Sequence, residues 1–440
     1  MSPVVIGLVL FGAMLVLMAL RVPIAIAMFV PGALGYVALS SEAALLSHLK
    51  GALFARFSVY DLSVIPLFLL MGQFATQGGL SAALFRAGAS LVGHFRGGLA
   101  MAAVLACAAF GAICGSSVAT AATVAQVALP EMKRFNYSGR LATATLAAGG
   151  TLGILIPPSV VLVVYAILAQ QNIAKLFAAA MVPGAIAAAS YLVAIGVYER
   201  MHPGHGPALP RQSRREQGAA LIDVWPVAAI FLAVFGGIYG GIFTPTEGAG
   251  VGAIGTFVAG ALKRELNVAA VRRSFLGAAE TSAMIFMIFL GADMLNSALA
   301  LSQMPAQLAS LVSTLEVAPL AIVAGVLVFY VILGCVMDEL SMILLTVPVL
   351  FPAIMSLDLF GLPPAEKAIW FGILILMVVE IGLIAPPVGL NVYVVNGLAP
   401  DVPMAETYRG VLPFLITAGM RVLLVMFFPG VALWAVRLMD

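Results

Sequence analysis

The chain has 440 residues, of which 63% are hydrophobic and only 9% are charged. Soluble domains are roughly 45–50% apolar, so this composition excludes an ordinary soluble protein and indicates an integral membrane protein. The formal net charge is +2, and no basic face exists outside the loops, which argues against binding to nucleic acid.

Apolar stretches follow one another along most of the chain, separated by short polar gaps. Each is about 20 residues long, enough to cross a hydrocarbon core of about 30 Å, and the pattern predicts an all-α polytopic membrane protein. The first stretch, residues 4–20, lacks a basic flank and a small-residue cleavage site. We therefore expect it to be a true span and not a signal peptide.

Clusters of basic residues indicate how the spans are oriented. By the positive-inside rule all of these clusters should face the cytoplasm. Residues 97–131 both begin and end beside such a cluster, so we expect them to form a re-entrant hairpin with "CGSSVAT" at its tip. Residues 318–353 are flanked by acids and predict a second hairpin, which carries "GCVMDELS" and opens on the other face. The clusters comprise Arg86 and Arg96; Lys133, Arg134 and Arg140; Arg200, Arg211, Arg214 and Arg215; and Lys263, Arg264, Arg272 and Arg273.

These hairpins divide the chain into two halves of opposite orientation. With the N-terminus outside, the pattern predicts about ten full spans and two hairpins, an inverted-repeat plan typical of secondary transporters. The first repeat, 1–198, holds scaffold spans 1–80, hairpin 97–131, a broken helix 141–172 and a span 177–198. A basic cytoplasmic loop, 199–223, leads to the second repeat, 224–440, with scaffold spans 224–298, hairpin 318–353, a broken helix 368–397 and a span 411–437.

A Pro-Pro pair interrupts an apolar stretch once in each half, in "GGTLGILIPPS" and in "EIGLIAPPVGLN". A helix that stops inside the bilayer leaves unpaired carbonyl and N–H groups, which lipid cannot satisfy. Such a break is tolerated where it lines a cavity, and there carbonyl ends coordinate small cations while helix N-termini attract anions. We predict two cation sites with an anion site between them, to which Ser117, Thr120, Ser159 and Asn391 are candidate contributors.

Several charged residues in apolar stretches have two interpretations. Asp338 and Glu339 are functional candidates because an ionisable group is expensive at membrane depth, and the alternative for Asp338 is that it only caps a hairpin helix. Glu380 either faces a cavity or pairs with a base. Arg421 either neutralises an anion or extends its head to the membrane surface.

Five motifs follow one another over essentially the whole chain: "GAICGSSVATAATVAQVALPEM", "GGTLGILIPPS", "GIFTPTEGAGVGA", "MDELSMILLTVPVLFPAI" and "EIGLIAPPVGLNVYVV". Together they resemble the large membrane subunit of the tripartite ATP-independent periplasmic (TRAP) transporters. The resemblance implies a scaffold and a mobile transport part that work as a sodium-driven elevator in the bacterial inner membrane, with the N-terminus in the periplasm. It also implies a small four-helix membrane subunit and a periplasmic solute-binding protein, which we expect as separate chains, and an organic acid substrate.

The resemblance also implies where sodium binds, as a coupling ion and without any organic cofactor or transition metal. The first site would use Ser116, Ser117, Gly153, Ile156 and Pro158. The second would use Gly334, Asp338, Gly382, Ala385 and Val388. The family often has threonine where this chain has Ala385, so a hydroxyl ligand is missing from the second site.

Three other functions are alternatives, and one of them, a passive channel, lacks support because rings of like charge along a pore are not apparent. A stand-alone sodium-coupled dicarboxylate or citrate-type carrier would need no binding protein, and deletion of the small subunit distinguishes it from a tripartite system. An intramembrane enzyme would need a catalytic set inside the bilayer, and no histidine lies in a predicted span, so we expect no enzyme. The substrate itself, a C4-dicarboxylate, a sialic acid or a similar carboxylate, is left open by the sequence.

Overall fold

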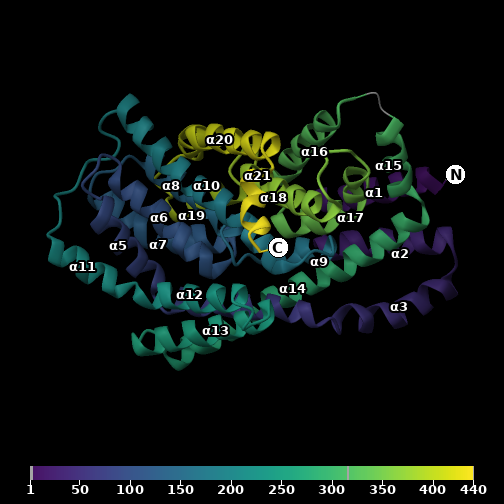
Figure 1. Cartoon of the computed structure of the whole chain (residues 1–440), viewed down its shortest axis with the longest axis horizontal. Coiled ribbons are helices and arrows are strands. Elements are labelled where there is room, and N and C mark those ends of the chain that lie inside the picture. The colour runs from purple at the N-terminus through teal and green to yellow at the C-terminus, as the bar shows by residue number, and fades with distance from the viewer. Residues whose placement is uncertain (1–2, 315–316, 440) are drawn as a thin grey trace.

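The computed structural model describes residues 3–314 and 317–439, and these form helices without any strand (Figure 1), as the all-α prediction requires. In chain order the elements are α1 (Pro3–Ala19), α2 (Ile24–Leu39), α3 (Glu42–Phe57), η1 (Tyr60–Ser63), α4 (Val64–Gln77), α5 (Leu80–Val92), α6 (Gly98–Cys114), α7 (Ser117–Arg134), α8 (Gly139–Leu155), α9 (Val160–Leu168), α10 (Ile173–Met201), α11 (Arg214–Asp223), α12 (Trp225–Tyr239), α13 (Pro245–Leu262), α14 (Val268–Leu301), α15 (Met304–Thr314), α16 (Pro319–Gly334), α17 (Glu339–Met355), α18 (Pro364–Gly382), α19 (Leu390–Leu398), α20 (Met404–Phe427) and α21 (Gly430–Arg437).

Three of the described helices, α10, α14 and α20, are by themselves long and apolar enough to cross a membrane. The number rises to six if each of three bent pairs is one span. These pairs are η1–α4 with α5, bent by 66°, α8 with α9, bent by 42°, and α11 with α12, bent by 47°. Several shorter apolar helices, such as α6, α16 and α17, add to them. The total of ten spans therefore stays a prediction.

Some helices have no counterpart among the expected segments. α3 and α15 are such helices, and α11 lies within the basic loop 199–223, where Ser213 and Glu216 form a capping box at its start. The stretch 411–437 holds two helices in place of one, because α20 ends at Phe427 and Pro429 precedes α21. Proline has no N–H to donate into a preceding turn, which accounts for this interruption.

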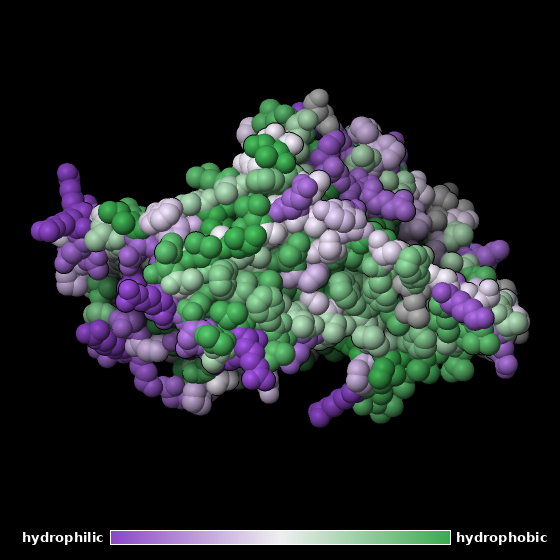
Figure 2. All heavy atoms as spheres, turned by 90° about the horizontal axis from the view of Figure 1, so that it is seen from below, coloured by the Kyte–Doolittle hydropathy of each residue, from purple (hydrophilic) through white to green (hydrophobic). Residues whose placement is uncertain are grey.

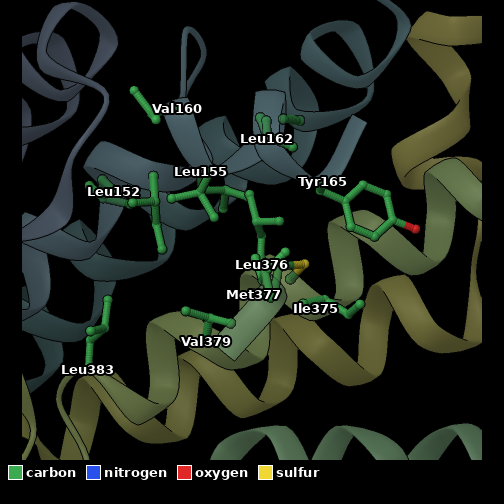
Figure 3. Close-up of a cluster of buried hydrophobic side chains, with 14 of the residues drawn as sticks. Leu152, Leu155, Val160, Leu162, Tyr165, Ile375, Leu376, Met377, Val379 and Leu383 are labelled. Carbon is green, nitrogen blue, oxygen red and sulfur yellow. The ribbon is translucent and has the colours of Figure 1, made fainter. Parts of the chain in front are cut away.

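The first halves of the two broken helices form the centre of the molecule. Every side chain from Leu141 to Leu155 in α8 is buried, and so is every side chain from Lys367 to Glu380 in α18. Figure 3 shows Leu152 and Leu155 of α8 and Tyr165 of α9 beside Leu376 and Met377 of α18. Burial in protein is the condition under which a helix can be broken at membrane depth.

The outer surface is strongly apolar over α12 and α13. Leu232, Ile254 and Leu262 are exposed there, and Figure 2 shows hydrophobic residues over much of the face seen from below, with hydrophilic residues at its left end and in smaller groups along its other margins. Helices α3, α12 and α13 run along this lower side in Figure 1. Such a surface suits contact with lipid or with another membrane helix.

The loops that carry basic residues lie together on one side of the molecule. The loop after α10 reaches both the α5–α6 turn and the α7–α8 turn through backbone hydrogen bonds, and ion pairs extend the same side to the start of α20. These contacts are Leu209 N to Gly93 O at 2.9 Å, Ser138 N to His205 O at 2.8 Å, Lys133 Nζ to Asp401 Oδ2 at 2.7 Å and Arg140 Nε to Glu406 Oε2 at 2.6 Å.

Candidate functional site

The tip of the first hairpin lies directly on the first helix break. Gly115, with a φ of +66°, ends α6, and the Ser116 hydroxyl accepts a hydrogen bond from Ala119 N to start α7. A Cβ placed on Gly153 would lie 2.7 Å from the Ser116 carbonyl oxygen and 2.6 Å from Thr120 Oγ1. Only a glycine leaves this space open, so the end of α8 and the hairpin tip form a small cradle of oxygen atoms.

The downstream side of the same break completes the cradle. The α9 half begins with Ser159 as its N-cap, and the Ser159 hydroxyl accepts a hydrogen bond from Leu162 N at 3.3 Å. A Cβ on Gly115 would lie 3.0 Å from the Pro158 carbonyl oxygen. Of the residues proposed for the first sodium site, the structure thus brings Ser116, Gly153 and Pro158 together. The side chain of Ile156 packs against Gly184, whereas the predicted sodium site uses the backbone of Ile156.

The second break has a corresponding arrangement. α16 ends at Gly334, and a Cβ on Gly382 would lie 2.6 Å from the Gly334 backbone. Gly111 and Gly153 make the equivalent close contact in the first half, where a Cβ on Gly111 would lie 2.6 Å from Gly153 Cα. In both halves the first helix of the hairpin therefore touches the broken helix through a pair of glycines.

Other residues proposed for the second site have partners already. Asp338 is the N-cap of α17, and its Oδ2 atom accepts a hydrogen bond from Ser341 N at 3.1 Å. The Val388 carbonyl oxygen accepts a hydrogen bond from Tyr408 Oη at 2.6 Å. Ala385 supplies only backbone groups. Gly334 and Gly382 are brought together, whereas Asp338 and Val388 serve contacts of their own.

The two hairpin tips touch each other. Ser117 Oγ donates a hydrogen bond to Glu339 Oε1 at 3.1 Å, and the two residues are the first residues of α7 and α17. Both side chains are buried, and Glu339 Oε2 has no hydrogen-bond partner among the described residues. Sequence reasoning identified Glu339 as a functional candidate because an ionisable group is expensive at membrane depth, but did not assign it to a sodium or anion site.

A cavity of about 1040 Å³ lies beside these tips. Ser116, Asp338 and Glu339 line it from the hairpins, and α1, α2 and α14 form its other wall, with Arg21 between the first two. Such a volume suits a small organic molecule. The cavity therefore lies between the hairpin tips on one side and α1, α2 and α14 on the other.

The residues proposed for the anion site are all fully buried, so their side chains do not reach open solvent. Ser117 bonds Glu339, and Ser159 caps α9. Asn391 Nδ2 donates to the Ala147 carbonyl oxygen at 3.2 Å, which ties α19 to α8. The Thr120 hydroxyl and Asn391 Oδ1 have no hydrogen-bond partner within the part of the chain that is described.

The donor atoms at the first break suit a small hard cation. Carbonyl and hydroxyl oxygens around Gly153 are the ligand type that broken membrane helices present to Na⁺. Over residues 3–314 and 317–439 no group of three or more His, Cys, Asp or Glu side chains is placed to hold a metal ion. The site chemistry is thus that of backbone and hydroxyl oxygens at helix ends.

Comparison with known proteins gives consistent results. The sequence model of the family described as "Tripartite ATP-independent periplasmic transporter, DctM component" matches residues 11–431. The C4-dicarboxylate TRAP transporter large permease protein DctM of Pseudomonas aeruginosa is 37% identical over 382 residues, which cover 87% of each chain. The sialic acid TRAP transporter large permease protein SiaM of Vibrio cholerae is 29% identical over 371 residues, 84% of each chain.

Among solved structures, the YdaH transporter of Alcanivorax borkumensis has a similar fold. Its TM-score is 0.63 at 17% sequence identity, and the match covers 88% of this chain and 90% of that one. At this identity the likeness speaks for the fold alone. The family match over nearly the whole chain and the identity to DctM decide the family. This chain is a large permease subunit of the tripartite ATP-independent periplasmic transporter family.

Proposed function

We propose that the chain carries a small organic acid across the bacterial inner membrane, driven by sodium entry. One observation carries this proposal: each half has a broken helix with a hairpin tip on it, and the two tips meet through Ser117 and Glu339. Sodium at such breaks would be held by the backbone carbonyl and hydroxyl oxygens at the helix ends. The cradle around Gly153 supports the first site more strongly than the contacts at Ala385 and Val388 support the second.

Helix ends also supply the means to bind a carboxylate. α7 and α17 both begin at the hairpin tips, so the free N–H groups and positive dipole ends of two helices meet beside the cavity. Arg21 adds a positive charge on the opposite wall. One relative is named for C4-dicarboxylates and another for sialic acid, and both names denote carboxylates. We therefore propose a carboxylate of this kind as the substrate.

Transport by an elevator movement agrees with the position of the cavity. It lies between the hairpin tips and the helices α1, α2 and α14, where a transport part would slide against a scaffold. The basic loops share one side of the molecule, which we assign to the cytoplasm by the positive-inside rule. This assignment puts the N-terminus in the periplasm.

The remaining components follow from the family. Its name is tripartite and the relatives are named large permeases, so we propose a small four-helix membrane subunit and a periplasmic solute-binding protein as partners. The exposed apolar surface on α12 and α13 is wide enough to accept lipid or membrane helices.

Uptake by proteoliposomes tests the proposal. They would hold this chain and the small subunit, with the binding protein added after a thermal-shift screen has identified its organic acid. We expect accumulation only with an inward sodium gradient. Equal uptake with an inward potassium gradient refutes the sodium coupling. Uptake of the free acid without the binding protein or the small subunit instead indicates the stand-alone carrier.

A further inference from the structure

A chain of buried polar side chains connects the two broken helices. It begins at Thr151 in α8 and ends at Glu380 in α18. These two residues occupy equivalent positions, because each lies six residues before the first proline of its pair, Pro157 or Pro386 (151 to 157 and 380 to 386). The chain therefore meets each helix at the same distance from its break.

Tyr191 of α10 and Arg421 of α20 bridge the space between these ends. Thr151 Oγ1 lies 3.3 Å from Tyr191 Oη, and Arg421 Nη2 donates to the same Tyr191 Oη at 3.1 Å. The guanidinium carbon of Arg421 lies 4.8 Å from the centre of the Tyr191 ring, and Arg421 Nη2 lies 3.5 Å from Glu380 Oε2. Four helices thus share one polar connection.

This connection is not the arrangement that would maximise stability. Arg421 is 4% exposed and the other three residues are 0% exposed. Glu380 Oε1 and the Nε and Nη1 atoms of Arg421 have no hydrogen-bond partner among the described residues. A buried ion pair with incomplete hydrogen bonding is often no more stable than an apolar pair of similar size. Packing alone therefore does not account for it.

Direct contact with the substrate does not account for it either, since none of the four side chains lines the cavity beside the hairpin tips. What the connection does link is the two breaks. We propose that Glu380 and Arg421, acting through Tyr191 and Thr151, are positioning residues that hold both breaks in one geometry, so that a cation bound at one break favours binding at the other. This inference rests on the proposed sodium coupling.

The proposed coupling between the breaks rests on how close each end of the polar connection lies to a glycine that contacts a hairpin. Thr151 lies two residues before Gly153, and Glu380 lies two residues before Gly382, the glycines that contact the hairpins. A cation that fixes the end of α8 also fixes Thr151, and this restricts the Tyr191 hydroxyl on which Arg421 depends. The second break is then partly ordered before its own cation arrives, which lowers the cost of binding there.

Sodium titration of the purified chain together with its small subunit tests this inference. Choline chloride keeps the ionic strength constant, and tryptophan fluorescence reports binding, because Trp370 of α18 donates a hydrogen bond to Val425 O of α20 beside the connection. A typical coupling of about 5- to 150-fold in affinity gives two equal sites a Hill coefficient of about 1.4 to 1.85. We expect this range for the unchanged protein.

Tyr191→Phe removes only the bridging hydroxyl, and Thr151→Val removes the hydroxyl at the end of the chain. Both should lower the Hill coefficient to about 1. Tyr330→Phe is the matched control, because Tyr330 is a fully buried tyrosine of α16 whose hydroxyl pairs with Thr346 Oγ1 at 2.6 Å, outside the connection. Tyr330→Phe should lower the melting temperature about as much as Tyr191→Phe does, and it should leave the Hill coefficient unchanged.

The other outcomes separate this inference from the proposed function. A Hill coefficient that stays high in Tyr191→Phe and Thr151→Val overturns the inference, as does a coefficient of 1 in the unchanged protein, and both leave sodium coupling intact. If neither fluorescence nor thermal unfolding responds specifically to sodium, the proposed coupling fails, and the inference fails with it.

Discussion

Replacing Gly153 by alanine should remove the first cation site. The new methyl group would lie 2.7 Å from the Ser116 carbonyl oxygen and 2.6 Å from Thr120 Oγ1. Neither distance is compatible with van der Waals contact, so the hairpin tip or the end of α8 must move. The Ser116 oxygen belongs to the backbone of a helix start, so no change of side-chain rotamer can relieve its clash with the new methyl group.

The cost follows from the size of this clash. An additional methylene in a well-packed core costs about 1 to 3 kcal/mol. If the strain falls on the form in which the tip closes around a cation, sodium affinity decreases about 5- to 150-fold. If the cradle does not bind the cation, the strain falls equally on the sodium-free and the sodium-bound protein, and only the stability of the fold decreases.

Two measurements distinguish these cases. The first is the sodium concentration that gives half-maximal uptake in proteoliposomes or half-maximal fluorescence change. It should rise about 5- to 150-fold. The second is thermal unfolding without sodium, which measures the stability of the fold. Gly325→Ala is the control, because no atom lies within 4 Å of the position where its Cβ would stand. A Gly153→Ala protein with unchanged sodium dependence would refute the assignment of this cradle to the cation.

Two further changes test the fold around the site. Lys133 Nζ lies 2.7 Å from Asp401 Oδ2, and this hydrogen bond holds the pKa of the Asp401 carboxyl below its usual value. The contribution of this pair to the stability of the fold should therefore be present above about pH 4 and be lost as the pH falls further. The melting temperature of Asp401→Asn should therefore lie below that of the unchanged protein at pH 7, and the two should converge at lower pH; a difference that persists there contradicts the pairing. Thr244→Ala removes the capping box that Thr244 forms with Glu247 at the start of α13, which should cost about 1 kcal/mol in denaturant unfolding. Thr244→Ser should retain most of that stability, and an equal loss in both variants would show that the hydroxyl is not responsible.

The parts of the site that sequence predicted depend on local chemistry. Proline lacks an N–H, and a serine or aspartate side chain bonds the backbone three residues further on, so the sequence predicts helix starts at Ser116 or Ser117, at Ser159 and, in one of two interpretations, at Asp338. The structure confirms Ser116, Ser159 and Asp338 as N-caps. None of these features requires knowledge of a distant partner.

The parts that sequence could not predict depend on distant pairs. Ser117 and Glu339 are 222 positions apart, and Tyr191 and Arg421 are 230 positions apart. A single sequence shows which residues carry charge but not which residue they face. Of the two interpretations of Arg421, the one in which it extends to the membrane surface was wrong, because Arg421 is buried and pairs with Glu380. The alternative in which Glu380 pairs with a base is confirmed.

Helices outside the apolar spans were missed for a different reason. α3 is capped by Ser41 and carries polar residues such as Glu42 and His48, so its apolar content is too low to suggest a span. Short helices of this kind gain most of their stability from tertiary contacts, which a search for long apolar stretches does not detect.

The packing of the broken helices supports the proposed coupling between the two breaks. The half-helix after the first break, α9, packs on α17 of the second hairpin, and the half-helix after the second break, α19, packs on α7 of the first hairpin. Tyr165 of α9 donates a hydrogen bond to Ala368 O of α18 at 2.6 Å, and Asn391 of α19 reaches Ala147 O of α8. Each break therefore has one wall from its own half and one from the other half. A hairpin cannot leave its broken helix without disturbing the other break. The hairpins and the broken helices should therefore move as a single body. The cavity bounded by α1, α2 and α14 is the boundary at which we expect that movement to occur.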